Sequence, residues 1–151
     1  MKGRAYLKHD YLGIVEIVEE VDGISSISFL DEKKGPEIFS VEVIKCKKEI
    51  EEYFEKKRTK FTIKINFKEG TKFQRSCWEA MYDIPYGKTI SYSEEAIAIN
   101  NPKAVRAVGG ANGKNPISIV VPWHRVIGKS GKLTGFGSGI WRKEYLLNLE
   151  K

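Results

Sequence analysis

The sequence has few cysteines, no long apolar run and no apolar N-terminal segment, so it lacks the features of disulfide-rich, membrane and secreted proteins. It contains only two cysteines, Cys46 and Cys77, which lack metal-ligand spacing and lie in stretches of helical periodicity. We therefore expect both thiols to be reduced, with no disulfide framework, no metal site and no cofactor. No apolar run approaches the roughly 18 residues that a membrane-spanning helix needs, and residues 1–10 carry no apolar core of a signal peptide. A cytoplasmic protein without a membrane partner is expected, nucleoid-associated or, in a eukaryote, nuclear.

Charge is plentiful, but it is unevenly distributed. The net charge of the 151 residues is +6. Residues 1–69 hold 14 basic and 14 acidic side chains, whereas residues 70–151 hold 12 basic and 6 acidic ones. A basic composition alone often reflects nothing more than a solvated surface. Its concentration in one part of the chain favours a polyanionic partner for that part.

Residues 1–69 are expected to form a small α+β lobe without catalytic spacing. Alternating apolar residues indicate strands, and apolar residues at helical spacing indicate a helix. The expected elements, in chain order, are a strand over 12–20, a strand over 24–30, a helix over 41–58 with Ser40 as its N-cap, and a strand over 61–67.

Residues 70–151 change to short helices with tight joints. The expected helices run from the N-cap Thr71 to Ile84, over 94–99 after the N-cap Ser93, and over 102–111 after Asn100-Asn101. The last two would form a helix-turn-helix, a common way to seat a helix against DNA.

The second helix of this pair consists mainly of small residues around one long cation, Arg106. Small side chains let a helix approach a surface closely, and the single arginine can project beyond them. Taken alone, the segment is more typical of a helix packed against its own protein with one solvated arginine. The residues that follow it favour a role in DNA binding.

Several short motifs occur in a distinctive order. They are Phe73-Gln74, Ile84-Pro85-Tyr86-Gly87, Ser91-Tyr92, Arg106-Ala107-Val108-Gly109, Asn115-Pro116, Pro122-Trp123-His124-Arg125-Val126, Gly135-Phe136 and Leu146-Leu147 before Glu150. Together they resemble the O6-alkylguanine-DNA alkyltransferase family over about residues 70–151. The resemblance implies an N-terminal α/β lobe of RNase H-like type, residues 1–69, and a C-terminal, winged-helix-like DNA-binding domain with a helix-turn-helix, residues 70–151.

The resemblance also implies how DNA is held. Arg106 would enter the duplex where the damaged nucleotide has rotated out, offsetting part of the few kcal/mol that unstacking costs. Tyr92 would crowd the neighbouring phosphate; otherwise it is a buried aromatic residue after a strand. Small residues would let the helix lie in the minor groove. The residues expected to contact DNA are Tyr92, Lys103, Ala104, Arg106, Ala107, Gly110 and Arg125.

The chain departs from the family at the alkyl acceptor. The second residue of the 122–126 motif is a cysteine in the transferases, and it is Trp123 in this chain. An indole N–H is a donor with no accessible anion near neutral pH, so it cannot replace a thiolate. The same Trp-His-Arg sequence occurs in the alkyltransferase-like members, which bind O6-alkylguanine without repairing it and pass it to nucleotide excision repair. The plain alternative is a core aromatic residue that fills a dead pocket.

The remaining site residues follow from the same resemblance. In the family, the cysteine, His124 and Glu150 positions form a proton relay; without the cysteine, we expect His124 and Glu150 to be an ordinary polar pair that orients the loop. Asn115 would brace the active-site turn. Phe136 stands where a tyrosine is usual, which removes a hydroxyl and keeps an aromatic face. Backbone N–H groups of 120–123 and 135–138 could contact the base. The expected lesion pocket comprises Tyr92, Asn115, Val121, Pro122, Trp123, Phe136, Gly137 and Ser138.

The leading hypothesis is a monomeric, non-enzymatic sensor that flips O6-alkylguanine out of duplex DNA and recruits nucleotide excision repair. The enzymatic alternative is a DNA-processing protein that transfers the alkyl group to Cys77, or that activates water with His124 and Glu150 in a glycosylase-like reaction. A third possibility is an architectural DNA binder without lesion preference. An engineered Trp123 in an active transferase ranks below these, because alanine or serine is the usual choice.

Overall fold

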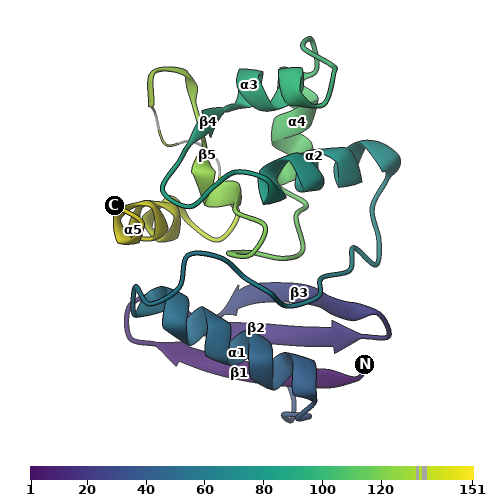
Figure 1. Ribbon diagram of the computed structural model, residues 1–151, viewed down its shortest axis with the longest axis vertical. Coiled ribbons are helices and arrows are strands. Elements are labelled where there is room, and N and C mark those ends of the chain that lie inside the picture. The colour runs from purple at the N-terminus through teal and green to yellow at the C-terminus, as the bar shows by residue number, and fades with distance from the viewer. Residues whose placement is uncertain (132, 134–135) are drawn as a thin grey trace. The chain divides into compact units, whose positions relative to one another are not determined.

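The computed structural model describes residues 1–131, 133 and 136–151, and it is a mixed α+β protein (Figure 1). The chain divides into two compact units. The first unit contains residues 1–68 and 116–118, and the second contains residues 69–115 and 119–151.

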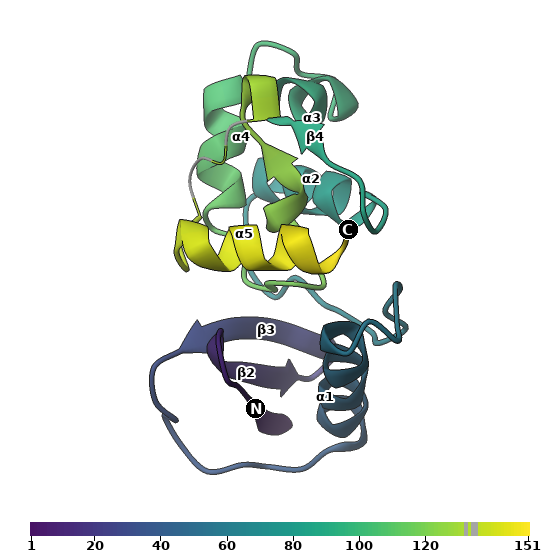
Figure 2. The same cartoon turned by 90° about the vertical axis from the view of Figure 1, so that its left-hand side faces the viewer.

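The first unit is an antiparallel sheet with one helix against it. The strands are β1 (Gly3–His9), β2 (Gly13–Glu20) and β3 (Gly23–Leu30), in that spatial order, and the helix is α1 (Val41–Phe54). Figure 2 shows α1 lying along one face of this sheet. Val15 and Ile17, two residues apart on the central strand, and Val43 and Ile50 on the helix are fully buried. The alternating residues on one face of β2 and the helically spaced residues of α1 therefore pack into one apolar core.

Two expected elements of this unit differ in the structure. The helix ends at Phe54 rather than Arg58, because Lys56 adopts a left-handed conformation with φ of 62°. The strand expected over 61–67 reduces to one bridge between Ile65 and Ile24. The outer edge of β3 is shared: residues 64–66 pair at Ile24, and residues 116–118 pair at Ile27. Neither segment therefore has room for a longer ladder. The first strand, β1, was not anticipated.

The second unit is mainly helical, with one short parallel pair of strands. Its elements are α2 (Lys72–Tyr82), β4 (Ile90–Ser91), α3 (Tyr92–Ala98), α4 (Val105–Asn112), the 3₁₀ turn η1 (Trp123–Arg125), β5 (Val126–Ile127), the 3₁₀ turn η2 (Lys129–Gly131) and α5 (Ile140–Leu149). Thr71 caps α2 as expected and forms a reciprocal capping box with Gln74.

The α3–α4 pair begins and ends differently from the expectation. Ser91, not Ser93, caps α3, because Ser91 can form a capping box with Glu94 three residues later. Asn100 then takes a left-handed conformation (φ 60°), and Pro102-Lys103 form a turn. The expected start of α4 at Pro102 is therefore wrong: α4 begins at Val105, and Ala104 is its N-cap residue.

Both cysteines are free and buried. Among the residues that the structure describes, no three His, Cys, Asp or Glu side chains come together as a metal site would require. Within the same residues, no helix has the length and apolar character needed to cross a membrane.

Candidate functional site

The 122–126 motif forms a tight turn that leads into β5. The backbone N–H of Trp123 donates to the carbonyl of Val121 at 2.9 Å, and that of Arg125 donates to Pro122 at 2.9 Å. The side-chain amide of Asn115 donates to the carbonyl of Val121 at 2.9 Å. Asn115 thus contacts the turn from outside it; its role in bracing the turn stays a prediction.

An aromatic pair lies at the tip of this turn. Trp123 is half-buried, and its ring centroid is 4.9 Å from that of Phe136, with the planes inclined by 40°. Gly113 and Gly137 flank the indole, since a Cβ at either position would lie 3.8 or 3.9 Å from it. The indole Nε1 is buried and makes no hydrogen bond with any described residue. The two rings contact each other directly, so no base can insert between them. A base could stack only on the outer face of the apolar wall that they form.

The two residues after Trp123 turn inward to a buried carboxylate. His124 Nε2 lies 2.7 Å from Glu150 Oε2, and the Arg125 guanidinium donates to both oxygens of Glu150 at 2.9 Å. A further arginine nitrogen donates to the Ile84 carbonyl at 2.7 Å. The expected pair of His124 and Glu150 is therefore part of a cluster of three residues that also includes Arg125.

This geometry corrects the expectation for Arg125. Its side chain was expected to contact DNA, but the residue is only 6% exposed, and its guanidinium is engaged by Glu150 and Ile84. A bidentate arginine–carboxylate pair is among the strongest ion-pair geometries in proteins. Arg125 accordingly joins the end of the chain to the 122–126 turn.

Burial sets the charge of His124. The imidazole is fully buried, and desolvation lowers its pKa below the ordinary value, although the hydrogen bond to Glu150 acts in the opposite direction. A neutral His124 therefore donates to a carboxylate that already accepts from Arg125 and from the Gly87 backbone N–H at 3.0 Å. Such an occupied carboxylate orients the loop and is poorly suited to activating water.

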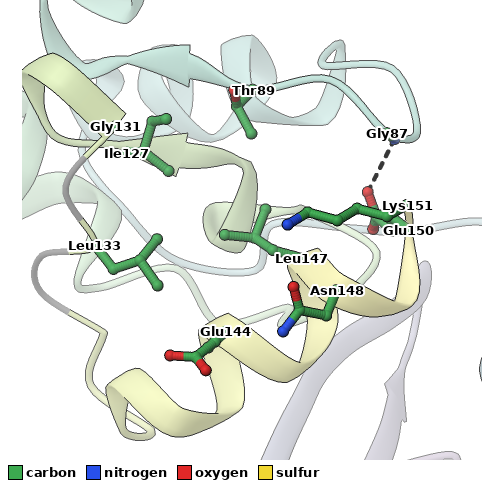
Figure 3. Close-up of a pocket in the computed structure, with 10 residues that line it drawn as sticks. All are labelled: Gly87, Thr89, Ile127, Gly131, Leu133, Glu144, Leu147, Asn148, Glu150 and Lys151. Carbon is green, nitrogen blue, oxygen red and sulfur yellow. Dashed lines mark hydrogen bonds between the residues drawn. The ribbon is translucent and has the colours of Figure 1, made fainter.

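A pocket of about 410 Å³ lies beside this carboxylate (Figure 3). The dashed line in Figure 3 is the hydrogen bond from Gly87 to Glu150. Apolar side chains of Ile127, Leu133 and Leu147 form part of its lining. The pocket shares Glu150 with the cluster, but none of the eight residues expected to surround a lesion is part of its described lining.

Three of the seven residues expected at DNA lie on the exposed side of α4. Arg106, Ala107 and Gly110 are exposed on this helix, whereas Val108 and Ala111 are buried on its other side. Nothing lies within 4 Å of a Cβ placed on Gly110, so this side of the helix is open. Arg106 forms no ion pair within the described part of the chain. Lys103 is exposed in the turn before α4, and Ala104 is half-buried at its N-cap.

Tyr92 begins α3 and is half-buried next to α4. Its ring lies 3.9 Å from a Cβ placed on Gly109, and the ammonium of Lys143 lies 5.9 Å from its centroid. Lys143 was not anticipated: it is fully buried on α5 and donates to the Val126 carbonyl at 2.5 Å. Desolvation lowers its pKa to about 8. Lys143 precedes the buried Leu146 by three residues, and this helical spacing is the sequence feature that indicates a buried position for Lys143.

The remaining segment is described in part. The expected backbone contact at Gly135 lies outside the described residues. Gly137 is exposed, and the carbonyl of Ser138 accepts a hydrogen bond from Arg142 at 2.7 Å. The segment between Phe136 and α5 is therefore joined to the first turn of that helix.

Comparison with known proteins decides the family. The family model described as "6-O-methylguanine DNA methyltransferase, DNA binding domain" matches residues 72–151. The chain belongs to this O6-methylguanine DNA methyltransferase family. A methylated-DNA–protein-cysteine methyltransferase of Methanosarcina barkeri is 44% identical over 147 residues, which cover 93% of this chain and 92% of the relative.

Solved structures of the family share the fold. The O6-methylguanine methyltransferase of Mycobacterium tuberculosis aligns over 97% of this chain and 91% of its own, with a TM-score of 0.86 and 38% identity. The same organism's protein has been solved in complex with DNA; that chain is 39% identical, aligns over 96% of this chain and 90% of its own, and has a TM-score of 0.84. The protein thus belongs to a family of DNA-binding alkylguanine repair proteins with the α+β fold described above. RNase H-like and winged-helix-like remain predictions for the two units.

Proposed function

We propose that this methyltransferase-family protein binds O6-alkylguanine in duplex DNA without accepting the alkyl group. The observation that carries the proposal is Trp123, an indole at the position where the resemblance places the acceptor cysteine. Alkyl transfer needs a thiolate, and an indole N–H provides no anion near neutral pH. The same residue offers an aromatic face, which suits recognition without transfer.

The two remaining thiols are poor substitutes for the acceptor. Cys77 is fully buried in α2, and desolvation together with the charge of Glu95 raises its pKa to about 11. Cys46 is fully buried in α1, and burial raises its pKa further still. Since the thiolate is the nucleophile, both cysteines are chemically inert at neutral pH.

The surroundings of His124 and Glu150 argue against hydrolysis as the alternative chemistry. Both side chains are buried, and the carboxylate already accepts from Arg125 and Gly87. A general base must reach the proton that it removes, directly or through one water. This pair is instead proposed to hold the loop that carries Trp123.

DNA binding is assigned to the exposed side of α4. Arg106 is the long cation among small residues there, and it makes no ion pair within the described part of the chain that would hold it back from a duplex. It is proposed to fill the space left by the extruded nucleotide, with Tyr92 next to the same helix. The positive excess of residues 70–151 would add an affinity that does not depend on sequence.

The lesion base is proposed to stack on the wall formed by Trp123 and Phe136. Base–aromatic stacking contributes about 1–3 kcal/mol per base, and an apolar wall tolerates alkyl groups of different size. A monomer that holds such a base without repairing it would serve as a signal for nucleotide excision repair proteins, which are its proposed partners.

The test is a titration of two duplexes that differ only in one base, O6-methylguanine or guanine, at a stated salt concentration. The wild type is expected to bind the lesion duplex more tightly. Trp123→Ala should weaken lesion binding about 5- to 150-fold, which corresponds to the stacking energy, and should leave binding of the guanine duplex unchanged. Equal affinity of the wild type for both duplexes would instead identify an architectural DNA binder.

A further inference from the structure

Two fully buried polar side chains connect α3 and α4. Glu95 on α3 and Asn112 on α4 are both 0% exposed. The Asn112 amide Nδ2 donates to Glu95 Oε1 at 2.7 Å. Glu95 Oε2 and Asn112 Oδ1 are also buried, and neither has a hydrogen-bond partner among the described residues. Both unpartnered atoms are acceptors when the carboxyl is ionised, and buried acceptors without donors are costly.

One proton on the carboxyl of Glu95 would provide a hydrogen bond for both unpartnered oxygens. If Oε2 of Glu95 carries a hydrogen, it becomes a donor, and Asn112 Oδ1 is the unpartnered acceptor on the residue already bonded to it. We propose that Glu95 is protonated in the folded protein and forms with Asn112 a doubly hydrogen-bonded acid–amide pair that positions α4. No covalent bond forms or breaks, because the proton comes from water and returns to it.

The charges around Glu95 agree with this protonation. Desolvation raises the pKa of Glu95 to about 7, although the hydrogen bond from Asn112 acts in the opposite direction. From α2, the Cys77 thiol faces it, and the charged side chains of that helix are exposed. β4 and β5 carry no titratable side chain, and the charged residue of α4, Arg106, is exposed. The buried cations Arg125 and Lys143 are not among the groups that shift the pKa of Glu95, so no cation offsets the desolvation of its carboxyl.

The pair acts on the end of α4 that is also held from α2. The buried indole of Trp78 donates to the carbonyl of Ala111 at 2.9 Å, one residue before Asn112. An ionised Glu95 would place a negative charge at the C-terminal end of α4, where the helix dipole is also negative. Loss of the proton should loosen this attachment and with it the placement of Arg106. The consequence for DNA rests on the proposed function; the acid–amide pair does not.

The first experiment tests the pair without DNA, in the full-length chain. The side-chain carboxyl carbons of glutamate are followed by NMR from pH 4 to pH 9 in the wild type and in Glu95→Gln, so that the missing resonance identifies Glu95. The expected midpoint is near 7. Between about pH 5 and 7, the unfolding equilibrium constant of the wild type should rise by about tenfold per pH unit relative to Glu95→Gln. A midpoint near the ordinary value of 4.5 would overturn the proposal.

The second experiment tests positioning through DNA affinity. Glu95→Gln keeps two hydrogen bonds to Asn112 without a titrating group, so its affinity for a lesion duplex should lack the pH dependence of the wild type. The wild type should lose about fivefold in affinity between pH 6 and pH 8 relative to this variant. Glu79→Gln makes the same substitution at an exposed residue of α2, and its affinity should follow the pH dependence of the wild type.

The outcomes separate the two proposals. A Glu95 midpoint near 7 with parallel pH profiles for wild type and Glu95→Gln would keep the pair and refute its positioning role. Absence of any lesion preference at all pH values would contradict the proposed function, while the NMR midpoint would still decide the acid–amide pair.

Discussion

Replacement of Glu150 by alanine tests the buried cluster that joins α5 to the 122–126 turn. Glu150 and Arg125 are each 6% exposed, and the guanidinium donates to both carboxylate oxygens. Removing one partner of a buried ion pair leaves the other charge uncompensated, which costs about 3–5 kcal/mol. Loss of the hydrogen bonds from His124 and Gly87 acts in the same direction. We therefore expect Glu150→Ala to lower the free energy of unfolding by about 3–5 kcal/mol.

Urea unfolding at pH 7.5, followed by far-ultraviolet circular dichroism, measures this change. With a slope of about 1–3 kcal/mol/M, the midpoint should fall by about 1–5 M. Glu144→Ala is the matched control, because Glu144 lies on the same helix and is exposed; it should change stability by less than about 0.5 kcal/mol. If Glu150→Ala were within about 1 kcal/mol of this control, the cluster would not hold the turn as argued.

Three further predictions follow from the same geometry. Arg106→Ala should weaken binding of the lesion duplex more than binding of the guanine duplex, because only the former holds an extruded nucleotide, and should reduce the slope of log affinity against log salt by about 1, with little change in stability; an unchanged slope would contradict the DNA contact. Cys77, whose pKa is raised to about 11, should react with a thiol reagent at pH 8 far more slowly in the native than in the denatured protein, and equal rates would contradict its burial. Because burial lowers the pKa of His124, the unfolded state binds its proton first as pH falls through 6.5, so stability should decline there in a Glu95→Gln background. Adding His124→Gln should reduce that decline, to which His9, whose pKa burial also lowers, contributes the rest; an undiminished decline would show that His124 is not responsible.

Local sequence signals predicted the elements whose structure depends on neighbouring residues. Ser40 and Thr71 cap their helices because a cap needs only a hydroxyl and the first turn that follows it. The expected cap of α3, Ser93, is wrong, and the actual cap is Ser91. Ser91 has a glutamate three residues later, as a capping box requires, and Ser93 does not. The capping-box spacing was therefore present in the sequence and outweighs the proximity of Ser93 to the helix.

Elements that depend on distant partners could not be derived in this way. Residues 61–67 alternate like a strand, but β3 offers them only Ile24, because residues 116–118 occupy the edge at Ile27. Arg125 is charged and belongs to a motif associated with DNA, yet it is buried against Glu150, 25 positions along the chain. The pairing of Glu95 with Asn112 likewise exists only once α3 and α4 pack together.

The central property proposed for this protein is binding of the lesion without transfer of the alkyl group. The decisive measurement is a titration of the O6-methylguanine duplex and its guanine counterpart at one salt concentration, with intact-mass analysis of protein and DNA from the same samples. We expect tighter binding of the lesion duplex and unchanged masses of both components after prolonged incubation. A protein that gains the mass of a methyl group, or a duplex that loses its methyl group or its damaged base, would contradict this expectation.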